Sequence, residues 1–193
     1  MLALAISGSP RQEGNTWQLL HLALEVLAEE GFETRFVSLH DKVIHPCLAC
    51  GTCQKKPNQC VQEDDFGEIL PLMHQAEVLL VGSPVYFGSA TPNLMALLDR
   101  AGYIARYGDN RFFRKVGAPL VVARRAGVNF TYAQLLFFFS ILGMIIPGST
   151  YWPIAYGLQK GDALQDAEGV ETIKNLAKNL AWVAKKLQST KDK

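Results

Sequence analysis

Charged residues are scarce in this sequence, and neither sign dominates. Lysine and arginine number 19 against 18 aspartate and glutamate, for a formal net charge of +1, and only 19% of the 193 residues are charged. A protein that binds nucleic acid needs a basic face to neutralise phosphates, and scattered charges of both signs do not supply one. The same balance argues against attachment to an anionic membrane surface. With 49% hydrophobic residues, the chain is too apolar for a disordered protein and can form a packed core.

The sequence also lacks an export signal and a long apolar run. The apolar stretch Met1–Ile6 has no basic residue before it and ends in a Gly/Ser/Pro turn, so it is too short for a signal peptide and is interpreted as a strand. The apolar segment Phe130–Ile146 is interrupted by polar residues and is shorter than the roughly 20 residues of a bilayer span. We therefore expect a cytoplasmic protein, in which Phe130–Ile146 is a buried helix or a subunit interface.

Short apolar runs alternate with helical patterns along the chain. The runs Leu2–Ile6, Val78–Val81 and Leu120–Ala123 lack the in/out alternation of a half-exposed strand, which is typical of strands buried on both faces. Two weaker strands are expected at Thr34–Leu39 and Met144–Trp152. Helical patterns occupy residues 16–30, 64–75 and 93–105 and a C-terminal segment that begins near Val170.

This alternation predicts an α/β fold in which helices cover both faces of a parallel sheet. Five strands suit the flavodoxin-like order 2-1-3-4-5, which forms a three-layer sandwich. We expect one domain over residues 1–189 and a solvated tail over 190–193. The order also predicts a ligand crevice between strands 1 and 3, at their carboxyl ends.

The loop after the first strand has the composition of a phosphate site. Residues 7–16 are rich in glycine and hydroxyl side chains, include Arg11, and lead directly into a helix. Unpaired backbone N–H groups at a helix start, hydroxyl donors and a cation together suit a phosphate monoester. The loop has neither a Walker lysine nor Gly-x-Gly-x-x-Gly spacing, so a nucleoside triphosphatase or a Rossmann dinucleotide site is not indicated. The alternative is a simple helix cap through Asn15 or Thr16.

The loop after the third strand suits a planar ligand. Within residues 82–92, Tyr86 and Phe87 stand between glycines, which let backbone N–H groups approach a ring closely and stabilise negative charge on it when it is reduced. Core packing is the alternative for either aromatic residue. After the fourth strand, Arg124 and Arg125 add cations at the same edge, either as ligands or as solvated charges. No Ser/His/Asp arrangement indicates a hydrolase.

Three stretches, Gly-Ser-Pro-Arg-x-x-Gly-Asn-Thr at 8–16, Gly-Ser-Pro-Val-Tyr-Phe-Gly at 82–88 and Leu-Leu-Asp-Arg at 97–100, resemble the NADPH-dependent FMN reductase family of flavodoxin-like flavoproteins. The resemblance covers most of the chain. It implies that FMN binds through its phosphate and its isoalloxazine ring to two sets of residues. Those for the phosphate are Ser9, Arg11, Asn15 and Thr16, and those for the ring are Pro84, Val85, Tyr86, Phe87 and Gly88, with Arg124 at the same edge.

The resemblance also implies an activity. NAD(P)H would deliver hydride to the flavin, and the reduced flavin would pass electrons to a small acceptor such as a quinone or another flavin. No catalytic residue is expected, because the flavin carries the chemistry. Relatives of this kind form dimers or tetramers, so a homodimer or homotetramer is expected.

All four cysteines lie in one cysteine-rich loop, residues 46–61. They are Cys47, Cys50, Cys53 and Cys60, with the spacing Cys-x2-Cys-x2-Cys-x6-Cys. A disulfide scaffold is not expected in a cytosolic domain with its own core. An iron-sulfur cluster and structural zinc both use four thiolates, and closely spaced cysteines favour a cubane cluster over the two separated Cys-x2-Cys pairs common at zinc sites. Free thiols are the third possibility.

The cysteine spacing resembles the iron-sulfur flavoprotein branch of the same family, whose members bind a four-iron, four-sulfur cluster and FMN and pass electrons between them. The alternative function is therefore an electron carrier whose cluster a ferredoxin-like partner reduces. Because the cysteine-rich loop follows the second strand, we expect a cluster to lie on the flavin's edge of the sheet.

Overall fold

The computed structural model describes residues 1–191, with side chains through residue 189. Five parallel strands form one sheet in the order β2-β1-β3-β4-β5. The strands are β1 (Leu2–Ser7), β2 (Glu33–Ser38), β3 (Val78–Pro84), β4 (Val116–Ala123) and β5 (Ile154–Tyr156). The predicted fold class and strand order are confirmed.

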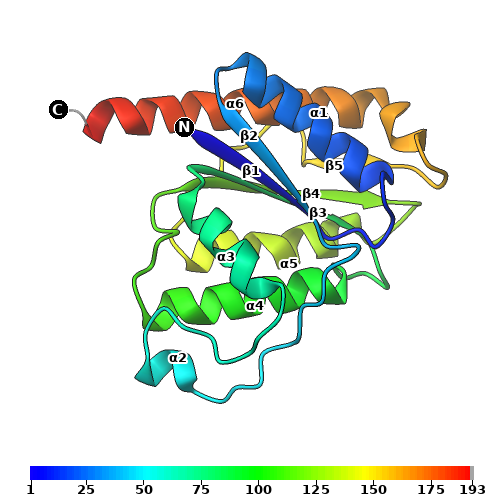
Figure 1. Ribbon diagram of the computed structural model, residues 1–193. Coiled ribbons are helices and arrows are strands. Elements are labelled where there is room, and N and C mark those ends of the chain that lie inside the picture. Colours follow the sequence, from blue (N-terminus) through cyan, green and yellow to red (C-terminus); the bar gives the residue numbers. More distant parts are fainter. Residues whose placement is uncertain (192–193) are drawn as a thin grey trace.

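Helices cover both faces of the sheet and make the three layers visible in Figure 1. One face carries α1 (Asn15–Glu29) and α6 (Ala167–Lys191), and the other carries α3 (Phe66–Gln75), α4 (Pro92–Tyr107) and α5 (Val128–Ile141). Two short elements complete the chain, α2 (Thr52–Lys55) and the 3-10 helix η1 (Asp162–Leu164).

The core consists of two layers because strand residues alternate between the faces of the sheet. From β1, Leu4 and Ile6 pack with α3, α4 and α5, whereas Ala3 and Ala5 pack with α1 and α6. Every residue of β4 and nearly every residue of β3 is buried, which explains their unbroken apolar character. Burying each large apolar side chain contributes about 2 kcal/mol to stability, so the central strands anchor the loops that follow them.

The fifth strand was expected at Met144–Trp152, and this prediction is wrong. The strand is only Ile154–Tyr156. Ile145 forms an isolated bridge with Val116. Pro147 has no backbone N–H to donate to a parallel ladder. The chain pairs with β4 again only at β5, which directly follows Pro153.

The C-terminal helix is longer than expected. It continues to Lys191, so residues 190 and 191 are helical where a tail was predicted, and residues 192–193 lie outside the described part of the chain.

The apolar segment predicted to be a buried helix or an interface forms α5 and the chain after it. Leu135 and Phe139 of α5 are buried, but Phe130, Phe137 and Ile141 are 76%, 71% and 63% exposed. Across residues 1–191, no helix combines the length and apolar character that crossing a membrane requires.

Candidate functional site

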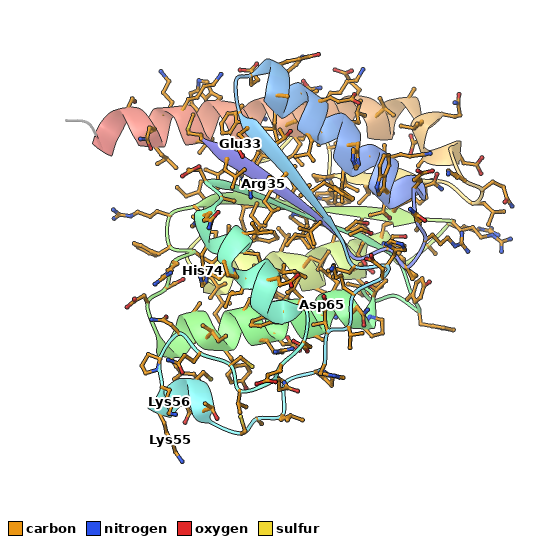
Figure 2. The ribbon with its side chains drawn as sticks, in the orientation of Figure 1. Glu33, Arg35, Lys55, Lys56, Asp65 and His74 are labelled. Carbon is orange, nitrogen blue, oxygen red and sulfur yellow. The ribbon has the colours of Figure 1, made fainter. Side chains whose placement is uncertain are left out.

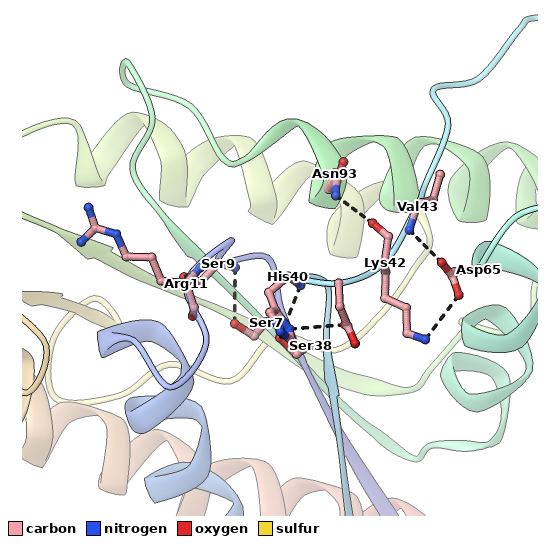
Figure 3. Close-up of polar contacts among 10 residues, drawn as sticks. Ser7, Ser9, Arg11, Ser38, His40, Lys42, Val43, Asp65 and Asn93 are labelled. Carbon is pink, nitrogen blue, oxygen red and sulfur yellow. Dashed lines mark hydrogen bonds and ion pairs between the residues drawn. The ribbon is translucent and has the colours of Figure 1, made fainter.

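The loop after β1 is stabilised by its own serine hydroxyls (Figure 3). The Ser7 hydroxyl accepts a hydrogen bond from the backbone N–H of Ser9 at 3.3 Å, and the Ser9 hydroxyl accepts one from the N–H of Arg11 at 3.1 Å. The Arg11 side chain extends away from both serines and is exposed. Helix α1 then begins after Gly14 without a side-chain cap, so its first N–H groups are free to bind an anion.

The Asn15 side chain connects the start of α1 to the loop after β5. Its amide nitrogen donates to the Gln159 carbonyl at 2.9 Å, and its oxygen accepts from the N–H groups of Gly161 and Ala163 at 2.8 and 3.4 Å. Asn15 therefore places the loop of residues 157–163 beside the predicted phosphate site. Neither cap expected at this helix start is present, because Asn15 bonds to another loop and the buried Thr16 makes no cap bond.

The loops after β1 and β3 are joined to each other. The Thr91 hydroxyl donates to the Gly8 carbonyl at 2.7 Å, and the Gly8 N–H donates to the Gly82 carbonyl at 2.8 Å. A Cβ at Gly8 would lie 2.8 Å from the Cβ of Leu94, so glycine is required at this approach.

The loop after β3 forms a tight turn at its tip. Tyr86 and Ser89 exchange backbone hydrogen bonds of 2.8 and 3.0 Å, and the two residues between them, Phe87 and Gly88, have φ angles of 51° and 78°. Positive φ at both central positions is the pattern of a type I′ turn, and it is strained for a bulky residue such as phenylalanine. Phe87 is fully exposed and Tyr86 is 43% exposed, so the core-packing alternative is wrong for both.

A cavity of about 310 Å³ opens where these loops meet the ends of β4 and β5. Most of the residues predicted for FMN line it together: Ser9, Arg11, Asn15, Thr16, Pro84, Val85, Tyr86 and Arg124. Phe87 and Gly88 lie at the tip of the turn and are not part of this lining.

Sequence reasoning missed several lining residues, including Gly157, Leu158 and Lys160. They follow β5, whose misplacement at 144–152 hid the loop that comes after it. A correct fifth strand would have shown them, since the carboxyl ends of parallel strands meet at one edge.

The cavity lining combines positive charge with apolar surface. Arg11, Arg124 and Lys160 supply positive charge, and Lys160 pairs with Glu13 at 2.7 Å. The hydrogen bond and the charge of Lys160 lower the pKa of Glu13. Apolar lining comes from β3, β4 and the loops after β3 and β5: Pro84, Val85, Val122, Ala123 and Leu158. This donor set suits a molecule with an anionic tail and a planar ring, so the residues fit FMN.

The chain after β2 is anchored before it reaches the cysteines (Figure 3). Asp65 accepts hydrogen bonds from the Val43 N–H at 2.7 Å and from Lys42 Nζ at 3.3 Å, and the Asn93 amide donates to the Lys42 carbonyl at 3.2 Å. The bond from the Val43 N–H, together with Lys42, lowers the pKa of Asp65. These contacts connect the segment to α3 and α4.

All four cysteines line a second cavity, of about 180 Å³, whose other wall is α4. None of the four forms a disulfide bond within the described part of the chain. Burial raises the pKa of the Cys53 thiol, and negative charge on the other three sulfurs adds to the effect, whereas a hydrogen bond with Thr52 lowers the pKa of Cys50. Among the described residues, no group of three or more histidine, cysteine, aspartate or glutamate side chains is placed to hold a metal ion. Four thiols that line one cavity are the kind of ligand set that an iron-sulfur cluster and a structural zinc ion both use.

The cysteine cavity does not lie where it was expected. Its α4 lining runs from Arg100 to Tyr107, whereas α4 begins at Pro92, next to the loop after β3. At 1.5 Å per residue, this lining is about 12–22 Å along the helix from Pro92. Lys55 and Lys56, close to Cys53, lie on the far side of α4 from the sheet in Figure 2. The expectation of a cluster on the flavin's edge of the sheet is thus wrong within this chain, because the loop runs back along α4.

A model of the NADPH-dependent FMN reductase family matches residues 1–159. The chain belongs to this family. This FMN reductase family member is 41% identical over 192 residues to an iron-sulfur flavoprotein of Methanocaldococcus jannaschii, covering 96% of this chain and 98% of the relative. It is 35% identical over 195 residues to the iron-sulfur flavoprotein of Methanosarcina thermophila, covering 100% of both.

Solved structures agree on the fold. RosB with bound 8-demethyl-8-formylriboflavin-5'-phosphate superposes with a TM-score of 0.79 at 20% identity, over 98% of this chain and 81% of that one. The apo form of the NADH:FMN oxidoreductase EmoB gives a TM-score of 0.67 at 18% identity, over 94% and 88%. These structures show that the FMN reductase family member has a flavodoxin-like fold. Its family makes it an oxidoreductase flavoprotein.

Proposed function

We propose that the protein binds FMN in the 310 Å³ cavity, takes hydride from NAD(P)H and passes the electrons to a small acceptor such as a quinone or a free flavin. The observation that carries the proposal is the meeting, in one cavity, of an uncapped helix start, three cationic side chains and an apolar surface. The family supports an FMN cofactor.

Each wall of the cavity has a distinct task. The Ser9 loop, the first N–H groups of α1 and Arg11 hold the phosphate, because hydrogen bonds from charged and aligned donors are the strong ones. Pro84, Val85 and Tyr86 position the ring against the loop after β3. Asn15 and Thr91 hold the neighbouring loops in place.

When bound, FMN supplies the hydride-accepting chemistry. The chain contributes position and electrostatics. Phe87, fully exposed beside Tyr86, offers an aromatic face next to the site for the nicotinamide or the acceptor.

Anaerobic rapid mixing tests the proposal. Protein loaded with FMN is mixed with NADPH and, separately, with NADH, and the flavin absorbance is followed. We expect one or both nucleotides to bleach the flavin, and a quinone added afterwards to restore it. Failure to retain FMN would refute the cavity assignment. Retention of FMN without reduction by either nucleotide would refute the oxidoreductase activity and leave the carrier function below.

A second candidate is an electron carrier in which an iron-sulfur cluster receives electrons from a ferredoxin-like protein and feeds FMN. The cavity lined by all four cysteines favours it, and two relatives similar over their whole length are named iron-sulfur flavoproteins. Cys47, Cys50, Cys53 and Cys60 would hold the cluster. Iron and acid-labile sulfide in anaerobically prepared protein, both lost in Cys50→Ser, would support the carrier. Protein that takes up neither would exclude it.

A further inference from the structure

Arg100 is the largest side chain that the fold buries completely. It lies in the middle of α4 and is 2% exposed. Arginine is almost never fully buried without a partner, and here Nη1 donates to Asp64 Oδ2 at 2.6 Å and to the His45 carbonyl at 3.2 Å. The guanidinium also lies 4.1 Å from the centroid of the Phe66 ring.

Stability alone does not explain this placement. A buried ion pair contributes little net stability compared with apolar residues of similar size, because both charges lose their hydration. The Nε of Arg100 has no hydrogen-bond partner among the described residues, which adds a further cost. The contacts of Nη2, the second arm of the guanidinium, therefore indicate what the buried arginine does.

The second arm of the guanidinium reaches the cysteine cavity. Nη2 donates to the Sγ of Cys60 at 3.3 Å and to the Gln62 carbonyl at 3.4 Å, and Arg100 itself lines the cavity with the four cysteines. The guanidinium is planar and rigid, so the bond to Asp64 on one arm fixes the direction of the other. Asp64 is held in turn by the N–H groups of His45 and Phe66 at 2.8 and 3.2 Å.

We propose that Arg100 is a positioning residue for Cys60, whose sulfur it orients and stabilises as a cluster ligand through the Nη2–Sγ hydrogen bond. The inference rests on the second candidate function. Hydrogen bonds to the sulfurs are among the factors that set the reduction potential of such clusters. An added electron makes the sulfur more negative, so a donor at Cys60 favours the reduced form and raises the potential. The same bond slows the loss of Cys60 from the iron.

Arg100→Lys in the full-length chain tests the proposal. Lysine keeps a positive charge near Asp64 but has no second arm to reach the sulfur. The protein is reconstituted without oxygen using ferrous iron and sulfide. Two quantities are then measured: the rate of iron release to a chelator, and the midpoint potential of the iron chromophore. Arg35→Lys is the matched control, since Arg35 lies on β2 and pairs with Glu33 at 3.2 Å (Figure 2).

We expect Arg100→Lys to release iron about 10-fold faster or more, the usual effect of losing a partner that orients a metal ligand. Its midpoint potential should be more negative, while Arg35→Lys behaves as wild type. A purely structural role for Arg100 would weaken iron retention but leave the potential unchanged, so an unchanged potential overturns the inference. If Arg100→Lys fails to unfold cooperatively or to bind FMN, Asp64→Asn decides by the same measurements, because it leaves the guanidinium without its anchor.

Failure of the carrier function and failure of the Arg100 inference give different results in these measurements. Wild-type protein that binds neither iron nor sulfide removes the cluster and the inference together, whatever the Arg100 variant does. Wild-type protein that binds both, next to an Arg100→Lys protein of unchanged potential, overturns the inference alone.

Discussion

The hydroxyl of Thr91 donates a hydrogen bond to the carbonyl of Gly8 at 2.7 Å, and the bond is buried. Thr91 occupies the N-cap position of α4, where threonine commonly caps the helix through its own hydroxyl. Here that hydroxyl bonds to another loop instead, and α4 has no side-chain cap. One residue thus connects the loop after β3 to the loop after β1, which are the two loops that form the candidate FMN site.

Replacing this hydroxyl tests the connection. Thr91→Val keeps the shape of the side chain but leaves the Gly8 carbonyl buried without its donor, which costs about 2 kcal/mol. We expect the free energy of unfolding to fall by that amount in urea titrations and FMN affinity to weaken. Thr131→Val is the matched control, because Thr131 is fully buried and its hydroxyl has no partner among the described residues. Equal destabilisation by the two variants would contradict the argument.

Arg11 is predicted to bind the phosphate of FMN and no other part of the cofactor. Losing one charge-assisted hydrogen bond costs about 2 kcal/mol, so Arg11→Ala should weaken FMN binding roughly 10-fold or more while leaving riboflavin binding unchanged. Titration of the fluorescence of both ligands measures this. Arg35→Ala, on β2 and outside the cavity lining, serves as the control. An equal loss for FMN and riboflavin would show that Arg11 contacts the ring or only supports the loop.

His74 makes the stability of the fold depend on pH. Burial lowers its pKa from 6.5 to about 4, and the charges of Arg111 and Lys115 add to the effect. The unfolded chain binds a proton below pH 6.5, whereas the folded protein does so only below about 4. Stability therefore falls as the pH drops through this window and the loss levels off below it. We expect a loss of about 2 kcal/mol, reduced from the full value of the shift because His74 is only half-buried.

His74→Leu isolates this contribution from the carboxylates. Figure 2 shows His74 near the end of α3. Its ring packs edge-on against the ring of Phe112, with 5.1 Å between the two ring centroids. Urea unfolding at pH 7 and at pH 4.5 should give a smaller difference in the free energy of unfolding for the variant than for wild type. The same difference in both proteins would mean that His74 does not titrate as described.

The homo-oligomer expected from the sequence stays a prediction, and the structure indicates which face to test. A groove of about 860 Å³ runs between α4 and α5 and is bordered by the exposed residues Phe137 and Ile141. Met95, Asp99, Gly102 and Arg106 follow one another on α4 at steps of four, three and four residues, so they share one face of that helix and line the groove. Exposed apolar surface of this kind commonly marks a protein interface.

Charge complementarity favours a second copy of the chain as the partner. Asp99 and Arg106 are about 10 Å apart along the helix, and neither has an ion-pair partner among the described residues. Two antiparallel copies of α4 related by a two-fold axis near Gly102 would bring each Asp99 opposite the partner's Arg106.

Light scattering on size-exclusion peaks should show a dimer for wild type. Asp99→Arg and Arg106→Asp should each give monomers, because each places like charges opposite one another, and the double exchange should restore the dimer. A monomeric wild type, or two single variants that stay dimeric, would contradict this interface.

The local sequence pattern was sufficient to locate the buried central strands. Buried parallel strands appear as unbroken apolar runs, and β1, β3 and β4 were all located in this way, although each extends beyond its run. The short β5 had no such signal, since its three residues lie between a proline-containing stretch and a polar loop. Its pairing with β4 depends on the sheet already being formed.

The sequence by itself determined the order of the elements and the two loops that face each other at the crevice, because spacing and composition act over a few neighbouring residues. Only the tertiary structure decided which side chains complete the site. Asn15 and Gln159 are 144 residues apart in the chain, and Arg100 and Cys60 are 40 apart. Contacts of this kind arise only when packing brings distant segments together, so no local pattern contains them.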